Sequence, residues 1–353
     1  MRVLIADGGT GGHIFPAIAV ADELKRRAVD AILFTGTKLG LEKDLVPRHG
    51  YELKLIRVGG LIGKGIFARI KTLLQLPVAY WQSRKIVSAF QPDVVIGFGA
   101  YASGPVLTAA HHKGVPTVIV EPNAVPGFTN RLASRFVDKV AVAFEDTGGV
   151  FRGKAVLTGT PIRAFKRQPI AHDRFTVGVY GGSQGSHALN QTILQALPAL
   201  AQWRERFHLI HQTGKAEFES IKAVYDKTAP FYEATPFIHN VEDFYNKCDL
   251  LVCRAGAITL AEIMVVGKAA ILVPLPTSTH GHQEQNARRL MEAGAAVMVL
   301  QSDFTENKML SLFEEFMNNP AKLKAMETAS LGMGKPEATK SVVDLAYSVA
   351  NKS

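Results

Sequence analysis

Short apolar runs and longer stretches with helical periodicity alternate along the first half of the chain. An apolar run at residues 2–6 precedes a helical pattern over residues 14–27. Further strands are predicted from the runs AILFTG at Ala31, LKLIRV at Leu53, DVVIGFG at Asp93, TVIVE at Thr117 and KVAVAF at Lys139. Strands that alternate with helices form βαβ units, so we expect a parallel sheet covered by helices on both faces.

The same layout begins again in the second half. From Phe175, the stretch FTVGVYGGSQGSHALNQTIL places an apolar strand before a glycine cluster and a helix, and FHLIHQTG, DLLVCRAG, AAILVPLP and AAVMVLQ supply further strands. The Pro-containing, basic segment 159–168 has the composition of a connection between domains. We therefore predict an α/β protein with domains at residues 1–162 and 163–335. A C-terminal helix over residues 336–353 is expected to pack on one of them, preferably the first.

Composition narrows the class of protein. The 353 residues are 47% hydrophobic and 20% charged, which argues against disorder. Nowhere does an uninterrupted apolar stretch reach the roughly 18 residues that a membrane span needs, and the run before Asp7 is too short for a signal peptide. Two cysteines, Cys248 and Cys253, make no disulfide scaffold, and His280 with His282 lack further ligands at metal-binding spacing. We expect a cytoplasmic protein whose net charge of +9 favours anionic surfaces.

Three loops predict the binding of a phosphate. Glycines cluster at residues 8–13 (GGTGGH) and 181–186 (GGSQGS), and in CRAGAITLAEI a strand ends before Gly256 and a helix begins near Ala257. Such loops let backbone amides approach an anion, which a helix N-terminus also attracts. Ile14 stands where a dinucleotide fingerprint needs glycine, and no Gly-Lys pair is followed by Ser or Thr as in a P-loop. The alternative for the first loop is a tight turn that binds nothing.

Eight motifs follow one another from residue 8 to about residue 290. They are GGTGGHIFPAIAVADEL from Gly8, GFGAYASGP from Gly97, EPNAVPGFTNR from Glu121, GTPIR from Gly159, VYGGSQGSHALNQ from Val179, HQTGK from His211, CRAGAITLAEI from Cys253 and HQEQNA from His282. Together they resemble the MurG family of peptidoglycan N-acetylglucosaminyltransferases. The resemblance implies the GT-B fold, in which two Rossmann-like parallel-sheet domains face each other across a deep cleft. It further implies inverting, metal-independent transfer of N-acetylglucosamine from UDP-N-acetylglucosamine to the muramyl C4 hydroxyl of lipid I, giving lipid II, with no cofactor.

The resemblance also implies roles for single residues. His13 and Glu121 are candidate catalytic bases. An ordinary histidine pKa near 6.5 suits proton transfer, although His13 is equally consistent with a packing or phosphate-loop histidine. Donor-binding positions are Thr10, Gly11, Gly12, Asn123, Arg163, Ser183, Ile238, Ala257, Ile258, Thr259, Leu260, Ala261, Glu262, Gln283 and Asn286. Of these, Ile238 is assigned to uracil, Glu262 to ribose, Ser183, Arg163 and residues 257–260 to the diphosphate, and Gln283 and Asn286 to the sugar. On the acceptor side lie Gly9, Tyr101 and Ser103.

A basic, apolar segment indicates contact with a membrane. Between residues 55 and 92 there are six basic and no acidic residues. On a helical wheel, one arc is apolar and two basic residues flank it: Ile66, Phe67, Ile70, Leu73, Leu74 and Pro77, with Arg69 and Lys71. An ordinary helix packed on the sheet is the alternative. We predict peripheral, salt-sensitive binding to anionic bilayers on the cytoplasmic side of the cell membrane, where other cell-wall enzymes are candidate partners.

Other functions stay open on the sequence. A UDP-N-acetylglucosamine 2-epimerase uses a similar scaffold, another GT-B transferase would take a soluble acceptor, and a non-catalytic protein would only sense the UDP-sugar. Nucleic acid is a minor option, because the basic residues are not interleaved with stacking aromatics. Release of UDP only when a lipid I analogue is present distinguishes the transferase from the epimerase and the sensor.

Overall fold

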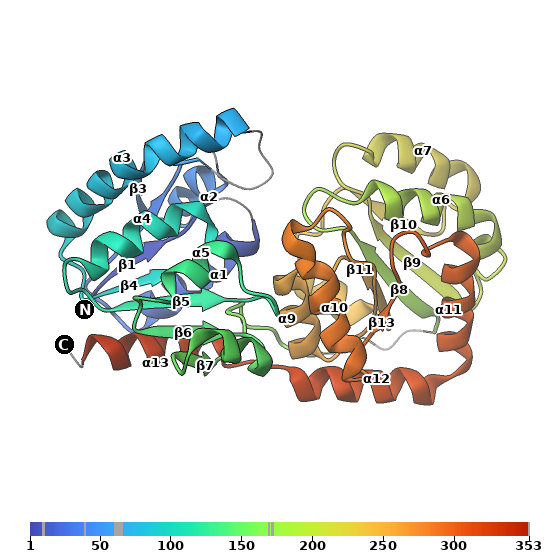
Figure 1. The fold of residues 1–353 in the computed structure, drawn as a ribbon. Helices are drawn as coiled ribbons and strands as arrows, with labels where there is room; N and C mark the ends of the chain where they lie inside the picture. Colours follow the sequence, from blue (N-terminus) through green and yellow to red (C-terminus); the bar gives the residue numbers. More distant parts are fainter. Residues whose placement is uncertain (9–10, 39, 60–65, 169, 171–172, 352–353) are drawn as a thin grey trace. The chain divides into compact units, whose positions relative to one another are not determined.

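The computed structural model describes residues 1–8, 11–38, 40–59, 66–168, 170 and 173–351, and for residues 66–73 it describes the backbone alone. The chain divides into two compact units (Figure 1). The first comprises Met1–Arg163 and Lys335–Ser353, and the second Ala164–Gly334. Each unit is built on one sheet, and the chain passes from one unit to the other at two places.

The first unit holds a parallel sheet of order β3-β2-β1-β4-β5-β6-β7. Its strands are β1 (Arg2–Ala6), β2 (Ala31–Gly36), β3 (Glu52–Leu55), β4 (Val94–Gly97), β5 (Thr117–Glu121), β6 (Lys139–Val142) and β7 (Ala155–Leu157). Its helices are α1 (Gly11–Arg26), α2 (Glu42–Arg48), α3 (Ile66–Phe90), α4 (Ala100–His111), α5 (Phe128–Ala133), the short 3₁₀ helix Glu145–Phe151 and α13 (Ala338–Ala350). The sheet order reverses beside β1, between β1 and β4.

Alternation along the strands builds a core on each face of this sheet. Val3 and Ile5 pack with α1 and α13, whereas Leu4 and Ala6 face α3, α4 and α5. In Figure 1 the red helix α13 lies along one side of the sheet and the blue helix α3 along the other. Because both faces are covered, the strands are apolar throughout, as is typical of parallel sheets.

The second unit repeats the design with the order β10-β9-β8-β11-β12-β13, again parallel. Its strands are β8 (Phe175–Tyr180), β9 (Phe207–Gln212), β10 (Glu233–Thr235), β11 (Leu250–Cys253), β12 (Ala269–Leu272) and β13 (Val297–Met298). Its helices are α6 (His187–Ala201), α7 (Phe218–Thr228), α8 (Val241–Lys247), α9 (Ala257–Val266), the 3₁₀ turn Thr279–Gly281, α10 (His282–Glu292), α11 (Glu306–Asn318) and α12 (Pro320–Met333). Here the order reverses between β8 and β11.

The faces of the second sheet also carry different helices. Val177 and Val179 of β8 pack in a large core with α6, α7 and α11. The intervening Gly178 faces Phe244 of α8, where an added methyl group would stand 2.5 Å from the ring. Tyr180 points to that same face and contacts Phe244 and Tyr245. This face therefore joins the end of β8 to helices α8 and α9.

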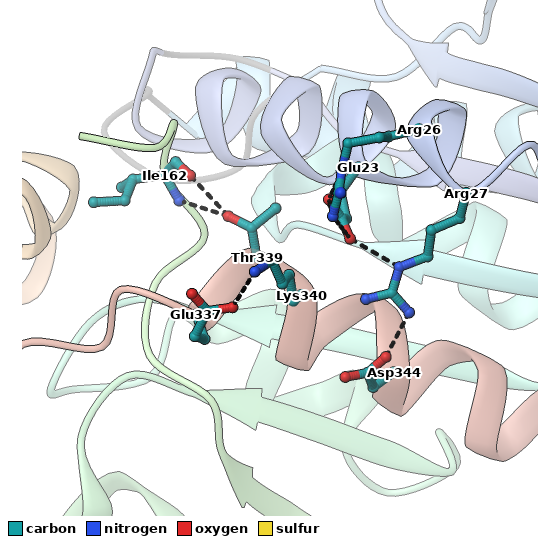
Figure 2. A network of polar contacts seen from close by, with 8 residues as sticks. All are labelled: Glu23, Arg26, Arg27, Ile162, Glu337, Thr339, Lys340 and Asp344. Atoms are coloured by element: carbon teal, nitrogen blue, oxygen red, sulfur yellow. Dashed lines mark hydrogen bonds and ion pairs between the residues drawn. The ribbon is translucent and has the colours of Figure 1, made fainter. Parts of the chain in front are cut away.

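Polar contacts tie the C-terminal helix α13 to the first unit (Figure 2). Thr339 Oγ1 donates to the carbonyl of Ile162 at 2.8 Å and accepts from its amide at 3.2 Å. Arg27, directly after the end of α1, pairs with Asp344 of α13 and with Glu23 of α1. Helix α13 is therefore held by these polar contacts as well as by the burial of Val342, Val343 and Ala346 in the core of the first unit.

The observed elements follow the predicted ones closely, and the predicted α/β class is confirmed. Two short strands, β7 and β10, were not predicted, and the strand expected at Leu53 begins one residue earlier and ends at Leu55. Cys248 was expected within a strand but caps the end of α8, two residues before β11 begins. Within the described part of the chain, no helix combines the length and the apolar content that crossing a bilayer would require.

Candidate active site

The sequence motifs lie where each sheet reverses its order. In the first unit, GGTGGH follows β1 and GFGAYASGP spans the end of β4. In the second, GGSQGS follows β8 and CRAGAITLAEI spans the end of β11. In open α/β sheets, ligands bind beyond the carboxyl ends of the strands at such a switch point. Each unit therefore has a candidate binding edge, and four separate motifs converge on the two edges.

The glycine loop of the second unit is packed directly against a neighbouring loop. Gly185 has φ +77°, and a methyl group on it would lie 2.2 Å from the carbonyl oxygen of Thr213. No side chain fits there, so the backbones of the two loops touch. Ser186 then caps α6 by accepting from the amide of Leu189. Ser183, at the tip of the loop, is exposed and accessible to a ligand.

Helix α9 begins with an open N-terminus. Its N-cap is Gly256, which has no side chain that could accept from the first amides, whereas Ser186, Asn240, Thr305 and Asn319 cap other helices of this unit. Residues 256–259 are half-buried, so their backbone is within reach of solvent. Uncapped first-turn amides and the helix dipole together favour an anion such as a diphosphate.

Arg254 places a buried positive charge directly before this helix. Its side chain donates to the carbonyls of Val273 and Pro274, to Ser186 Oγ at 2.7 Å and to Gln301 Oε1 at 2.7 Å. Burial lowers the pKa of the guanidinium, and these acceptors are all neutral. The arginine thus fastens the glycine loop to the ends of β11 and β12 and brings a cation, held by these neutral acceptors, to this edge of the sheet.

Glu262 lies on α9 and is half-buried, and its carboxylate is fixed by a hydrogen bond from a buried tyrosine. Tyr245 donates its hydroxyl to Glu262 Oε2 at 2.8 Å, and the hydroxyl of Tyr180 lies 2.7 Å from that of Tyr245. Burial raises the pKa of both tyrosines far above the ordinary value, so both remain protonated donors. A carboxylate fixed in this way can accept hydrogen bonds from paired hydroxyls such as those of a ribose.

The remaining donor candidates differ in exposure. Ile238 is half-buried in the segment between β10 and α8, and Gln283 is half-buried and accepts from the Leu275 amide through Oε1. Asn286 is fully buried and donates to the carbonyl of Ala255, which gives it a part in holding the loop before α9. The side chains of Leu260 and Ala261 are buried as well. The half-buried Ala257, Ile258 and Thr259 offer their backbone.

In the first unit, three segments meet at Gly99. Its φ is +88°, and a methyl group there would lie 3.3 Å from His13 Cε1 and 3.3 Å from Asn130 Nδ2. The close approach brings the start of α1, the β4–α4 loop and helix α5 together at the carboxyl edge of the sheet. His13 is half-buried on the first turn of α1, beside Gly11 and the exposed Gly12.

Glu121 ends β5 and is 2% exposed. Its Oε1 accepts from the amide and the side chain of Asn123 at 3.0 and 3.1 Å, and its Oε2 from the Gly127 amide and Asn130 Nδ2, each at 2.9 Å. Burial raises the pKa of Glu121, and these donors oppose the rise. The carboxylate therefore organises the loop 122–127, and with it the position of Asn123.

A second buried carboxylate stands at the end of β1. Asp7 is fully buried, and no described side chain donates to either of its oxygens, while the backbone of Gly8 acts to lower its pKa. Burial, with a further contribution from Glu42, raises its pKa to about 8. Glu42 is buried too and accepts from the amide and hydroxyl of Thr37. At neutral pH, Asp7 is thus mostly protonated.

The remaining candidate site residues lie outside the described residues or differ in their exposure. Gly9 and Thr10 lie outside the described residues. Tyr101 is half-buried near the start of α4, whereas Ser103 is fully buried and donates to the carbonyl of Ala100. Arg163 is exposed as the last residue of the first unit's first segment.

Apolar side chains are exposed along α3. Leu74 is 73% exposed, Val78 47% and Trp81 59%. Their spacing of four and three residues puts them on one face of the helix, and Arg84 stacks on Trp81 at 5.7 Å. The predicted side chains of Ile66, Phe67, Arg69, Ile70 and Lys71 lie outside the described part of the structure. Val78 and Trp81 extend the surface beyond the arc predicted from the sequence.

A metal ion requires a particular arrangement of side chains. Among the described residues, no group of three or more His, Cys, Asp and Glu side chains is arranged to hold a metal ion. The histidine pair near α10 includes His282, whose pKa is lowered by burial.

Three sets of residues that shape the two edges were not predicted from the sequence. Arg254 lies within the motif CRAGAITLAEI. Its position directly after a fully apolar strand is the feature that could have indicated its role. Tyr180 and Tyr245 are 65 positions apart, and nothing in the sequence pairs them. Asn130 lies within the motif EPNAVPGFTNR, but the sequence predicted no role for it. It follows Glu121 by nine residues on helix α5, where its side-chain amide can donate to the Glu121 carboxylate.

Comparisons with known proteins cover nearly the whole chain. Residues 3–142 match the glycosyltransferase family 28 N-terminal domain, and residues 176–342 match the glycosyltransferase family 28 C-terminal domain. A relative from Myxococcus xanthus is 45% identical over 352 residues, covering 98% of this chain and 92% of its own. One from Syntrophus aciditrophicus is 44% identical, covering 98% and 97%. Both are named UDP-N-acetylglucosamine--N-acetylmuramyl-(pentapeptide) pyrophosphoryl-undecaprenol N-acetylglucosamine transferase.

Solved structures give the same fold. MurG from Acinetobacter baumannii matches with a TM-score of 0.82 at 32% identity, covering 98% of this chain and 99% of that one. A UDP-GlcNAc 2-epimerase from Neisseria meningitidis, bound to UDP-GlcNAc, matches with a TM-score of 0.68 at 13% identity over 98% of this chain and 99% of that one. The second likeness shows a shared fold alone.

Proposed function

Because this chain belongs to the MurG family within glycosyltransferase family 28, we propose that it transfers N-acetylglucosamine from UDP-N-acetylglucosamine to lipid I, forming lipid II for peptidoglycan synthesis. The acceptor group is the C4 hydroxyl of the N-acetylmuramyl residue, and the anomeric centre is inverted. The observation that carries the proposal is the near full-length match to relatives named for this reaction. The epimerase alternative has only the fold in its favour.

The edge of the second sheet suits the donor. Departure of UDP leaves negative charge on a diphosphate, and catalysis requires donors already aimed at that charge. The first turn of α9 and the loop 181–185 supply such donors, with Ser183 and Arg163 as further candidates. Arg254 adds positive charge near this edge, while its side chain donates to Ser186 and other groups of the protein. Glu262 is assigned to the ribose, Ile238 to the uracil and Gln283 to the sugar. No divalent cation is required in this scheme.

The edge of the first sheet suits the acceptor. The C4 hydroxyl must lose a proton as it attacks, and His13 is the better of the two candidate bases. Its ring is half-buried beside Gly99, whereas both oxygens of Glu121 already accept from the adjoining loop and α5. Glu121 then acts by positioning Asn123, and Tyr101 lines the acceptor side.

One assay separates the candidate functions. The intact protein is incubated with UDP-N-acetylglucosamine, with and without a lipid I analogue, in buffer containing EDTA. We expect UDP release only with the acceptor, and a disaccharide product, undiminished by the chelator. Formation of UDP-N-acetylmannosamine would instead indicate an epimerase, and absence of turnover a sensor. Loss of transfer with EDTA would contradict the metal-free scheme.

We further propose that α3 binds an anionic bilayer on the cytoplasmic side of the membrane. Leu74, Val78 and Trp81 form an exposed apolar face, with Arg84 and Lys85 one turn further along the helix. This composition suits insertion at the headgroup boundary, and the acceptor itself is lipid-linked.

Sedimentation with anionic liposomes tests the membrane proposal. Leu74→Ser/Trp81→Ser should bind several-fold less than the natural protein, and high salt should weaken binding of both. Val224→Ser, which removes an exposed apolar side chain from the second unit, is the matched control and should bind normally. Equal sedimentation of all three proteins would refute the role of α3.

A further inference from the structure

A chain of hydroxyl groups runs beneath the donor edge of the second unit. Tyr180 ends β8, Tyr245 lies on α8, and Glu262 is the sixth residue of α9. The two tyrosine hydroxyls are 2.7 Å apart, and Tyr245 is 2.8 Å from Glu262 Oε2. Tyr180 also lies on the face of the sheet that carries α8 and contacts Phe244 there. Three elements that are distant in sequence thus converge on one carboxylate.

The chemistry of the groups fixes the direction of these bonds. An ionised carboxylate only accepts, so Tyr245 must donate its single proton to Glu262. The Tyr245 oxygen can then only accept from Tyr180. The order of donation is Tyr180 to Tyr245 to Glu262.

Burial makes the arrangement rigid. Tyr245 is fully buried and Tyr180 is 8% exposed. The ring of Tyr245 packs against Phe165 and Phe244, and that of Tyr180 against Phe244. Because these rings cannot turn without disturbing the packing, the hydroxyl of Tyr245 offers Glu262 a fixed donor in surroundings of low polarity, where such a bond is strong.

We propose that Tyr245, supported by Tyr180, is a positioning residue that presets the Glu262 carboxylate to recognise the ribose 2′-hydroxyl, and so determines the preference of the site for ribonucleotides over 2′-deoxyribonucleotides. This inference rests on the proposed function, which assigns Glu262 to the ribose.

The preference can be measured directly as a ratio of affinities. Calorimetric titration of the full-length protein with UDP and with 2′-deoxy-UDP gives the two Kd values. A hydrogen bond to a charged group is worth roughly tenfold or more in binding, so the natural protein should prefer UDP by at least about tenfold. In Tyr245→Phe, the ratio should fall to about threefold or less. The KM for UDP-N-acetylglucosamine should rise while kcat stays within about twofold.

Two further variants separate positioning from a general loss of stability. Tyr232→Phe is the matched control, because Tyr232 is another buried tyrosine of this unit and donates to the Leu200 carbonyl, away from Glu262. It should lower stability comparably and leave the ratio unchanged. The double variant Tyr180→Phe/Tyr245→Phe removes both hydroxyls, so that neither is left buried without the other as its partner. Its ratio of affinities for UDP and 2′-deoxy-UDP should equal that of Tyr245→Phe.

The outcomes distinguish this inference from the proposed function. If the natural protein prefers UDP and Tyr245→Phe keeps the full preference, the positioning role is refuted while the ribose assignment stands. If the natural protein binds both nucleotides equally, the assignment of Glu262 to the ribose fails, and the inference fails with it. A lowered ratio in Tyr232→Phe would also overturn the inference, because the loss would then follow from stability alone.

Discussion

Two buried carboxylates of the first unit, Glu121 and Asp7, show how surroundings decide what a side chain does. Both end strands of the same sheet. Glu121 has four hydrogen-bond donors and serves as the anchor of a loop. At Asp7 the effect of burial outweighs the backbone of Gly8, which acts to lower the pKa, so the carboxyl group keeps its proton at neutral pH. The residue type alone predicts neither outcome.

The protonated Asp7 makes stability depend on pH. Its pKa is about 8 in the folded protein against 3.8 in the unfolded chain. Between these values the folded state binds a proton that the unfolded state does not, so stability should decline with rising pH by at most about 1.4 kcal/mol per pH unit. The loss is complete above the folded pKa. Asp7→Asn should remove this slope. Urea unfolding at about pH 5 and pH 8 compares the two proteins, and parallel losses would contradict the assignment.

Glu121 and His13 should respond differently to substitution. In Glu121→Gln the new amide group faces N–H donors, whichever way it turns, so the protein should lose roughly 1–3 kcal/mol of stability. His13→Ala should leave the melting temperature nearly unchanged and lower kcat for transfer by about a hundredfold or more. Thermal unfolding and steady-state kinetics measure both. If His13→Ala raised only the acceptor KM, His13 would not be the base.

Among the elements, α13 depends on tertiary contacts for its position. Its buried face lies against α1 and the first sheet, and its start is bonded to the backbone of Ile162. The bonds of Thr339 are partly buried, whereas Asp344 pairs with Arg27 at the surface. Because water screens surface ion pairs, the two contacts should contribute unequally.

Paired substitutions test that ranking. Thr339→Val keeps the volume and removes both bonds to Ile162, and should cost about 1–2 kcal/mol in unfolding free energy. Asp344→Asn should cost about 0.5 kcal/mol or less. Denaturant unfolding followed in the intact protein gives both values. A larger loss for the surface substitution would show that the helix is held mainly by charge.

Element type was predictable from the sequence wherever apolar runs were strong. The strands β1, β2 and β5 were predicted at their observed bounds, because parallel strands buried on both faces are apolar throughout. The strands β7 and β10, with three residues each, are too short and too exposed to stand out. The glycine loops were found because phosphate chemistry needs them. Partners such as Tyr245 were not, because contacts between distant elements leave no local pattern.

At the scale of the molecule, one sheet plan is used twice for different tasks. Each unit reverses its strand order beside its first strand, and each concentrates its motifs at that edge. The second edge has an uncapped helix, a buried arginine and a fixed carboxylate, which suit a nucleoside diphosphate. The first has a histidine near an organised loop, which suits a hydroxyl acceptor. These differences are the basis for assigning the UDP-sugar donor to the second unit and the acceptor to the first.

Hydrogen–deuterium exchange of the intact protein with and without UDP tests most directly whether the second unit binds the donor nucleotide. The account predicts slower exchange in peptides covering residues 181–187 and 256–262, where amides would hold the diphosphate, and little change in peptides covering residues 99–103 and 121–130. Protection confined to the first unit would contradict it.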